Sequence, residues 1–430
     1  MEEVNFEDSG KLLRILDAIE NSPLVGWISV SGTVPKSTIT PKEAYENIQK
    51  HYKQLLQEFP TFRLKVVNID GKNYFKYAEN NEIQMDSLIK IIEGITPLQD
   101  GYSEWLPFDK PLWRVELSET ENDKTKIRLK ICHGIIDGRV AFDVLDIFYH
   151  LSLNKPFTER LNNYRNQPAL YEFGKACWYT EEIIKKGFVE PEVFSKAIQV
   201  ELFPSITRPS HYMHPQWEVA YAPISAFCRK YNVTAQPIVM AIQNEALRAY
   251  HKGKYDDIPI IVFCPVDNRK YPYATELFKK ALFYYHVGNI YPMIDKKEDI
   301  LENIIHCSQK FKESYNSMEA CISGYSWANL TDEKGQTIHR FTKANNPCKT
   351  NITFASHLGL VGEGMDNLNF SNLMEVYDDF YFVHFYGYHN KTTFYFSLNA
   401  PYNCPKEFFQ IYKDTSMKYY NFIVEKVTEK

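Results

Sequence analysis

The stretch KTKIRLKICHGIIDGRV, residues 124–140, constrains the fold more than any other part of the chain. From 126 to 131 apolar residues alternate with Lys and Arg, which predicts a strand with one buried and one solvated face. His133 continues the apolar series, so its side chain should point to the buried side, where an imidazole needs a polar partner. Gly138 then permits a tight junction between this strand and a helix. The apolar periodicity predicts that helix over 138–153.

His133 and Asp137 each have two interpretations. Asp137 suits the N-cap of the following helix, and His133 could be a hydrogen-bonded core residue at a strand end. In the chemical interpretation, His133 is a general base, because a neutral imidazole can take a proton from a hydroxyl, amine or thiol. Asp137 would then hold the local loop through a salt bridge. Cys132 should point to the opposite face of the strand, which argues against a Cys–His pair.

Signals for helices and strands mix along the chain. Thr40, Pro41 and Glu43 form a capping box with proline at the first helical position, and Gly71 separates the two strands of a hairpin. The predicted strands are GWISVSGTV, RLKVVNID, KNYFKYA, LWRVELSE, KTKIRLKICH, IPIIVFCPV, TNITFASHL, DDFYFVHFYGYHN and KTTFYFSLNA. The predicted helices are those beginning at Pro41 and Gly138, followed by PISAFCRKYN, QPIVMAIQNEALRAYH, DILENIIHCSQKFKESYNSM and CPKEFFQIYKDTSMKYYNFIVEKV.

This mixture predicts an α/β or α+β fold with two halves of similar make-up. The chain has 430 residues, which suggests two domains at roughly 100–200 residues each. A region rich in Asn, Pro and charge separates the halves. We therefore expect an N-terminal domain over 1–175, a crossover over 176–205 and a C-terminal domain over 206–430.

Composition argues against several classes of function. The 49 basic and 54 acidic residues leave no basic excess, which argues against a nucleic-acid partner. No apolar run reaches the roughly 18–20 residues that span a bilayer, and the start, MEEVNFEDSG, lacks the features of a secretory signal.

The eight cysteines are scattered, which predicts reduced thiols in a cytoplasmic protein. We find no clustered metal ligands. The 30 Tyr and 28 Phe predict aromatic-lined surfaces or a tunnel.

The segment CHGIIDG (132–138) resembles the HHxxxDG motif of the superfamily of CoA-dependent acyltransferases and condensation enzymes. That superfamily includes alcohol acetyltransferases, polyketide-associated acyltransferases, plant BAHD enzymes, chloramphenicol acetyltransferase and peptide-synthetase condensation domains. Further segments in matching order extend the resemblance over about residues 20–400. They are LPFDKPLWRVEL (106–117), CRKYNVTAQPIVMAIQNEAL (228–247), FCPVDNRKY (263–271), HVGNIYPM (286–293) and ITFASHLGLV (352–361).

The chain also departs from the superfamily pattern. Cys132 replaces the first His of the motif, whereas the second, catalytic His is present as His133. The DFGWG motif of the plant enzymes is missing, which argues against that branch. His357 stands where the superfamily has the Asn of its "SN.G" strand, so any polar role of that position is in doubt.

The resemblance implies a fold of two chloramphenicol-acetyltransferase-like halves, each a mixed sheet flanked by helices, with an active-site tunnel between them. His133 would deprotonate the acceptor, and Asp137 would pair with Arg269, with Gly138 also supporting the site. Asn289, after Gly288, would lie at the tunnel, and Ser356 is a candidate donor to the developing oxyanion. Each also has a simpler interpretation: Arg269 as a surface arginine, Asn289 in a turn and Ser356 as an ordinary strand residue.

Lys343 and Lys349 are candidates for contact with the phosphates of CoA, although a solvated loop is the better explanation of both. The function implied is acyl transfer from acyl-CoA to a hydroxyl or amine of a small, hydrophobic acceptor, as in alcohol acetyltransferases, with acyl-CoA as co-substrate and no bound cofactor. Two alternatives stay open. In one, an acyl-carrier protein supplies the thioester. In the other, the protein is a catalytically silent binding protein of the same fold, which an intact HxxxDG motif argues against.

Overall fold

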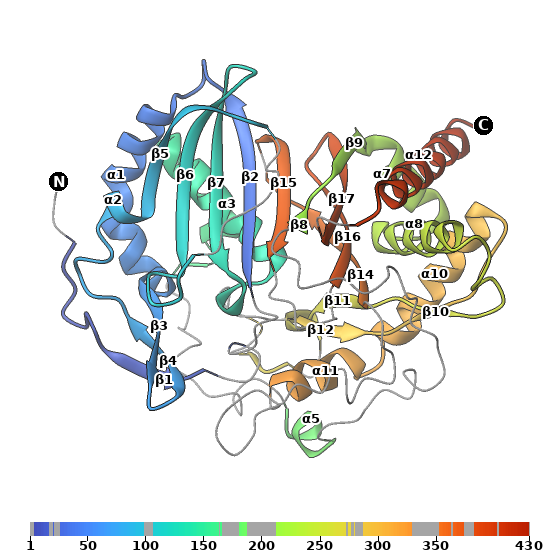
Figure 1. Cartoon of the computed structure of the whole chain (residues 1–430), viewed down its shortest axis with the longest axis horizontal. Helices are drawn as coiled ribbons and strands as arrows, with labels where there is room; N and C mark the ends of the chain where they lie inside the picture. Colours follow the sequence, from blue (N-terminus) through green and yellow to red (C-terminus); the bar gives the residue numbers. More distant parts are fainter. Residues whose placement is uncertain are drawn as a thin grey trace.

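A computed structural model provides the three-dimensional structure of the chain. It describes residues 4–16, 20, 26–98, 106–162, 164–165, 180–186, 212–271, 274–276, 279, 287–328, 352–362, 364–373, 382–401 and 404–429. Lys343 and Lys349 therefore lie outside the described residues. Two separate hydrophobic cores divide the molecule into two lobes of mixed α/β structure, as predicted, and Figure 1 shows them side by side.

The first lobe is built on a five-stranded sheet in the order β15-β2-β7-β6-β5, with a smaller sheet β1-β4-β3. Helices α1 and α3 contact each other and the strands of the larger sheet. The elements are β1 (Leu12–Ile15), β2 (Trp27–Pro35), α1 (Pro41–Glu58), η1 (Pro60–Arg63), β3 (Leu64–Ile69), β4 (Lys72–Tyr77), α2 (Met85–Leu88), β5 (Ile89–Thr96), β6 (Trp113–Thr120), β7 (Lys124–Cys132), η2 (His133–Ile135), α3 (Gly138–Ser152), α4 (Glu159–Asn162) and, from later in the chain, β15 (Asp366–Leu373).

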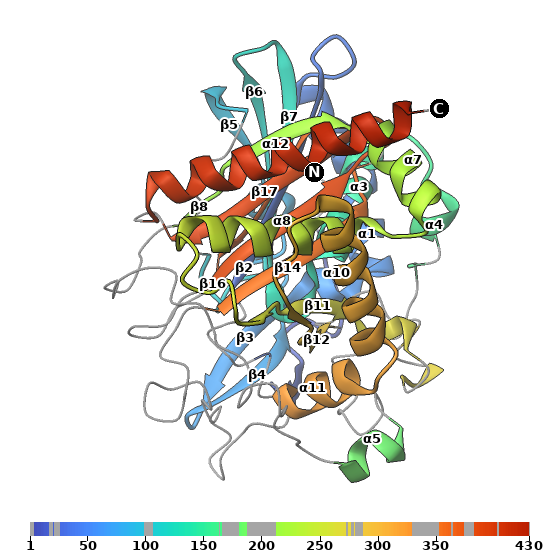
Figure 2. The ribbon, with the colours of Figure 1, turned by 90° about the vertical axis from the view of Figure 1, so that its right-hand side faces the viewer.

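The second lobe is built on a sheet in the order β14-β16-β17-β8, in which β9 also pairs with β17. Figure 2 shows helices α8, α10 and α12 covering one side of this sheet. The elements are α5 (Glu181–Lys186), β8 (Tyr212–Met213), β9 (Gln216–Ala220), α7 (Tyr221–Tyr231), α8 (Ala235–Tyr250), β10 (Ile260–Ile261), β11 (Cys264–Asp267), η5 (Asn268–Lys270), β12 (Val287–Ile290), β13 (Met293–Ile294), α10 (Ile300–Tyr315), α11 (Glu319–Ala328), β14 (Ile352–Leu360), β16 (Phe382–His389), β17 (Thr393–Pro401) and α12 (Lys406–Thr428).

Local signals in the sequence are confirmed where they are strongest. At the start of α1, the Thr40 hydroxyl accepts from the Glu43 N–H at 3.2 Å, and the Glu43 carboxylate accepts from the Thr40 N–H at 2.8 Å. Between β3 and β4, Asp70 and Gly71 have φ of 51° and 79°. Positive φ at both positions is the type I′ turn that suits a two-residue hairpin.

Strand β15 was missed by the sequence analysis, and it links the two lobes. It pairs antiparallel with β2 of the first sheet, although its residues, 366–373, lie within the range expected for the second domain. Figure 1 shows β15 beside β2, with β16 and β17 on its other side. Phe370 of β15 packs in the first core and contacts Tyr386 of β16, with ring centroids 4.7 Å apart. The chain therefore crosses back into the first lobe before it completes the second.

The polar face of β7 is not solvated, contrary to the prediction. Lys126 and Lys130 are only 2% and 4% exposed. The Lys126 ammonium donates to the carbonyls of Pro97 and Leu98 at 3.0 Å, and Lys130 pairs with Glu116 at 3.2 Å. Alternation of residue types therefore distinguished the two faces correctly, but it could not show that the chain after β5 covers the basic face.

The segment IPIIVFCPV is also not one continuous strand. Its start forms β10, which pairs with β13, and its end forms β11, which pairs with β12. Between them, Phe263 forms a parallel bridge with Phe354 of β14. The segment changes hydrogen-bonding partners in the middle, and this attaches the β11–β12 pair to the main sheet of the second lobe.

No helix in the described ranges combines the length and the apolar character that crossing a bilayer requires.

Candidate active site

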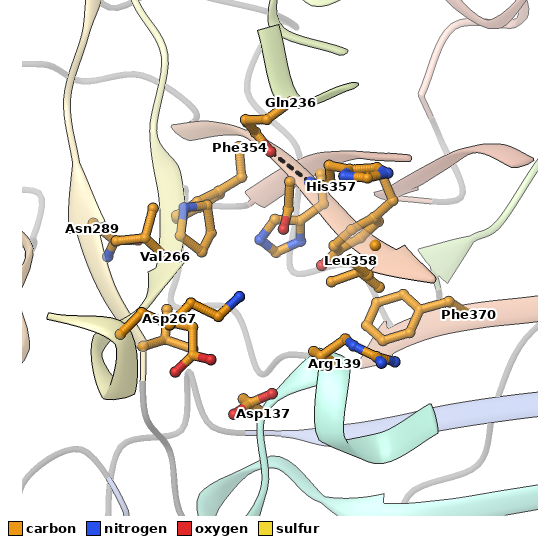
Figure 3. A pocket seen from close by; sticks show the side chains of 18 of the residues that line it. Asp137, Arg139, Gln236, Val266, Asp267, Asn289, Phe354, His357, Leu358 and Phe370 are labelled. Carbon is orange, nitrogen blue, oxygen red and sulfur yellow. Dashed lines mark hydrogen bonds between the residues drawn. The ribbon is translucent and has the colours of Figure 1, made fainter. Parts of the chain in front are cut away.

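A cavity of about 600 Å³ lies between the lobes. Helix α3 contributes from the first lobe, strands β11, β12, β14 and β16 contribute from the second, and β15 joins them. Figure 3 shows the side chains that converge on it. The lining residues are His133, Asp137, Gly138, Arg139, Arg160, Thr234, Gln236, Pro265, Val266, Asp267, Lys270, Val287, Asn289, Phe311, Tyr315, Phe354, Ser356, His357, Leu358, Gly359, Leu360, Phe370, Asn372, His384 and Tyr386.

His133 reaches this cavity because strand β7 ends immediately before it. Its N–H donates to the Gly26 carbonyl at 2.8 Å, and the short turn of η2 brings the Ile136 carbonyl to 2.8 Å from its Nδ1. A carbonyl oxygen can only accept, so Nδ1 carries the proton. Nε2 is therefore the basic nitrogen of the neutral ring, which is the tautomer a general base requires.

Burial sets the charge of His133. Removal from water disfavours the imidazolium and lowers the pKa of His133 to about 4, although the bond to Ile136 acts in the opposite direction. At neutral pH the ring is consequently neutral and able to take a proton. Cys132 is 4% exposed, and burial raises the pKa of its thiol to about 12. A Cys132 thiolate is therefore not available near pH 7.

Asp137 fulfils two structural functions at once. Its Oδ1 accepts from the Val140 N–H at 3.0 Å and so caps helix α3, while its Oδ2 accepts from Arg269 Nη2 at 2.7 Å. The cap and the salt bridge, which the sequence analysis left as alternatives, therefore both exist. Burial raises the pKa of Asp137, and the positive charge of Arg269 opposes that change.

Arg269 is shared between two carboxylates. Its Nε donates to Asp267 at 2.7 Å, and its side chain is only 11% exposed. Burial disfavours the guanidinium charge, but Asp137 and Asp267 outweigh burial and raise the pKa of Arg269. Because Asp137 starts α3 in one lobe and Arg269 follows β11 in the other, this group of charges joins the lobes below the cavity. Arg269 is thus not a surface residue.

Gly138 is favoured for a different reason from the one predicted. Its backbone is not left-handed, but a Cβ at this position would lie 3.1 Å from the ring of Phe370. The glycine therefore lets β15 pack closely against the start of α3. Similarly, a Cβ on Gly288 would lie 1.9 Å from the carbonyl oxygen of Ala320. That close approach of α11 fixes β12, and with it the neighbouring Asn289.

Asn289 and Ser356 both line the cavity, as predicted. Asn289 is 9% exposed, and among the described residues its Oδ1 is buried without a hydrogen-bond partner. Such atoms are uncommon in folded proteins and indicate a place for a ligand or water. Ser356 lies on β14 next to Tyr386 of β16. Its catalytic contribution, like the substrate contacts of Asn289, stays a prediction.

The sequence analysis missed Gln236 and His384. Gln236 Nε2 donates to the Ala355 carbonyl at 2.9 Å, and its Oε1 accepts from the His357 N–H at 2.6 Å. These bonds hold the backbone on either side of Ser356. His384, on β16, packs against the ring of Phe354 at 4.5 Å. Burial, with a smaller effect of His133, lowers the pKa of His384 to about 3.

A polar residue at a buried position of a predicted helix or strand was the available signal for both. Gln236 directly precedes the apolar stretch PIVMAI of its helix, and His384 interrupts an aromatic strand. Among the described residues, no cluster of His, Cys, Asp and Glu side chains has the arrangement of a metal site.

The two-lobed fold of this chain is similar to that of an epimerization domain, of a polyketide synthase associated protein and of a condensation-domain structure. The epimerization domain from the third module of tyrocidine synthetase B has a TM-score of 0.61 at 11% identity, with 98% of each chain covered. Polyketide synthase associated protein 5 from Mycobacterium tuberculosis has a TM-score of 0.62 at 12% identity, with 96% of this chain and 100% of that chain covered.

A third similar structure is described as the basis for condensation domain-mediated chain release from the enacyloxin polyketide synthase. Its TM-score is 0.56 at 10% identity, and the match covers 100% of this chain and 85% of that chain. No protein-family model matches the chain, and no curated protein sequence matches it. At these identities the similarity establishes the fold.

Proposed function

We propose that this protein is an acyltransferase that moves an acyl group from a thioester to a hydroxyl or amine, with His133 as the general base. The observation that carries the proposal is the hydrogen bond from His133 Nδ1 to the Ile136 carbonyl. It leaves Nε2 unprotonated on a ring that lines a cavity between two lobes. A base of this kind typically contributes roughly 10²–10⁴-fold to a reaction rate.

The reaction would proceed as follows. His133 Nε2 takes the proton of the acceptor as the acceptor oxygen or nitrogen attacks the thioester carbonyl carbon. Ser356 is the candidate donor to the oxyanion that develops. When the carbon–sulfur bond breaks, the leaving thiolate takes the proton from the imidazolium, so that His133 returns to its neutral form. The ester or amide and the free thiol are the products.

The proposal assigns Asp137, Gly138 and Arg269 to the support of this site. The Asp137–Arg269 ion pair connects the start of α3 to the end of β11, and both elements border the cavity. If the pair sets the separation of the lobes, it also sets the space in which donor and acceptor meet. Asn289 is the candidate contact for a polar group of the substrate, because its Oδ1 is buried without a partner among the described residues.

The donor that we propose is an acyl-CoA, as in enzymes similar to alcohol acetyltransferases. A carrier-protein thioester is the alternative, and the likeness to a condensation domain and to an epimerization domain favours it equally. Both donors present a thioester, so the part played by His133 is the same. The cytoplasm, where acyl-CoA is available, is the proposed location.

The decisive experiment measures thiol release from a panel of acyl-CoA donors and from acylated 4′-phosphopantetheinyl carrier proteins, each with a panel of alcohols and amines. Mass spectrometry then identifies the ester or amide. Product formation that requires His133 supports the proposal, and the donor that works distinguishes the two forms of it. Binding of donors without turnover in either panel would favour the silent binding protein.

A further inference from the structure

On the side of the cavity formed by α3 and β14, a guanidinium group is only partly neutralised by a carboxylate. Arg139, which follows Gly138, lines the cavity. Its Nη1 lies 3.2 Å from Asp143 Oδ1, an ion pair without hydrogen-bond geometry. Asp143 is closer to Arg160, at 2.8 Å. Within the described part of the chain, Arg139 has no other polar partner, so most of its five N–H donors are available to a ligand.

His357 lies on the same side of the cavity as Arg139, with Leu358 and Phe370 between them in Figure 3. The ring of His357 is held by parallel contacts with His389 at 5.5 Å and Phe394 at 5.7 Å. Gln236 fixes its backbone. Its Nε2 is buried and has no hydrogen-bond partner among the described residues. A buried polar atom of this kind requires a partner, and a cavity-lining position lets a ligand supply it.

The electrostatic surroundings favour an anion at this place. Burial, and then the electrostatic effects of His389 and of the Arg139 guanidinium, lower the pKa of His357 to about 3. Arg139 is therefore close enough to act on His357. The carboxylates of Asp137 and Asp267 also line the cavity, but both bond to Arg269. Among the described residues, the cavity-lining cations that lack a hydrogen-bonded carboxylate are Arg139 and Lys270, and Arg139 is the one whose charge acts on His357.

We infer that Arg139 and His357 form a subsite for an anionic group, in the first place a carboxylate on the acyl acceptor. This assignment names the substrate class of the proposed acyltransferase and therefore rests on that function. The planar guanidinium of Arg139 would bind two oxygens of the anionic group. The ring Nε2–H of His357 would donate to one of these oxygens from the other side. The apolar walls formed by Val266, Phe354, Leu358 and Phe370 would hold the body of the molecule. The same chemistry would accept a phosphate of the donor.

Direct binding tests the subsite without any need for turnover. The probes are 3-phenylpropanoate and 3-phenylpropanamide, which share a shape and differ in charge, measured by calorimetry or ligand-observed NMR. For the donor arm, the matched pair is 4′-phosphopantetheine and pantetheine. Loss of a charge-assisted hydrogen bond is worth about tenfold or more in affinity. The carboxylate should therefore bind at least about tenfold more tightly than the amide.

Arg139→Gln should remove this preference, and His357→Gln should reduce it. Arg139→Lys, which keeps the charge but not the planar fork, should retain part of it. Arg229→Gln on α7 and His51→Gln on α1 are matched controls away from the cavity, and they should leave the preference unchanged. Circular dichroism of each variant separates a folding defect from loss of the subsite.

A preference that appears only for phosphopantetheine over pantetheine, and disappears in Arg139→Gln, would retain the anion subsite but assign it to the donor. Equal binding within both probe pairs, or preferences that Arg139→Gln leaves intact, would overturn the inference. Because the probes contain no thioester, a negative result here is distinct from a failure of the acyltransferase proposal. That proposal fails only in the thiol-release assay.

Discussion

Arg269 Nη2 lies 2.7 Å from Asp137 Oδ2 across the junction of the two lobes. The two residues are 132 positions apart in the chain, and each directly follows a strand or turn that ends at the cavity. One carboxylate thus starts helix α3 and also binds the other lobe. This arrangement makes the helix that follows His133 depend on the position of the second lobe.

Substitutions at Asp137 can separate its two contacts. Asp137→Ala removes the cap of α3 and leaves Arg269 without one of its carboxylates. Breaking a buried ion pair costs on the order of 3–5 kcal/mol, so urea unfolding should show a loss approaching that size. Asp137→Asn keeps an acceptor for the cap and removes only the charge, so it should be less damaging by about 1 kcal/mol, the usual value of a cap. Equal stability of both variants and the wild type would contradict the arrangement.

His133→Ala should lower turnover by roughly 10²–10⁴-fold, because the residual rate lacks a base. The melting temperature should change little, unlike that of Asp137→Ala. Cys132→Ala is the matched control at the adjacent position, and it should retain most activity because burial raises the pKa of that thiol to about 12. If the cysteine variant were inactive and the histidine variant active, a thiol mechanism would have to replace the base mechanism.

Stability in acid should depend on the buried histidines. Burial lowers the pKa of His133 to about 4 and that of His384 to about 3, whereas an unfolded imidazole has a pKa near 6.5. Between these values the unfolded chain binds protons that the folded chain does not, so the free energy of unfolding falls as the pH falls from about 6.5 toward 4. In this pH range each such histidine contributes about 1.4 kcal/mol per pH unit to the slope of the free energy of unfolding against pH.

Urea unfolding of wild type and His384→Gln between pH 5 and pH 8 measures this contribution. Near pH 5 the variant should show a slope smaller by about 1.4 kcal/mol per pH unit, and above pH 7.5 the two curves should run parallel. Burial raises the pKa of Glu319 to about 7, which acts in the opposite direction in both proteins and cancels in the comparison. Identical slopes near pH 5 would show that His384 is protonated in the folded protein.

Gln236 should matter for the geometry of β14. Gln236→Leu leaves the Ala355 carbonyl and the His357 N–H without their partner, and each unsatisfied buried group costs about 1–3 kcal/mol. Gln236→Glu keeps the acceptor for His357 but loses the donor to Ala355, so it should lie between wild type and the leucine variant. Thermal unfolding gives the order, and crystal structures of the variants would show whether Ser356 moves. A leucine variant as stable as the wild type would contradict this account.

Short-range interactions made several elements predictable, including the junction of β7 and α3 that carries His133 and Asp137. Helix α1 follows from its capping box, the β3–β4 hairpin from Gly71, and the β7–α3 junction from alternation followed by helical periodicity. In each case, the residues that interact are within a few positions of one another. The pairing of Asp137 with Arg269 was expected only because the ordered motifs resemble a known superfamily, and neither residue by itself indicated the other.

The remaining features depended on contacts between distant segments, and here the sequence pattern carried little information. Strand β15 joins the first sheet from residues 366–373, because hydrogen bonding to β2 requires a free sheet edge that only the assembled lobe offers. Lys126 and Lys130 are buried although alternation marks them as the polar face. Tertiary packing therefore decided which elements form the interior, where Gln236 finds its partners and which side chains surround His133.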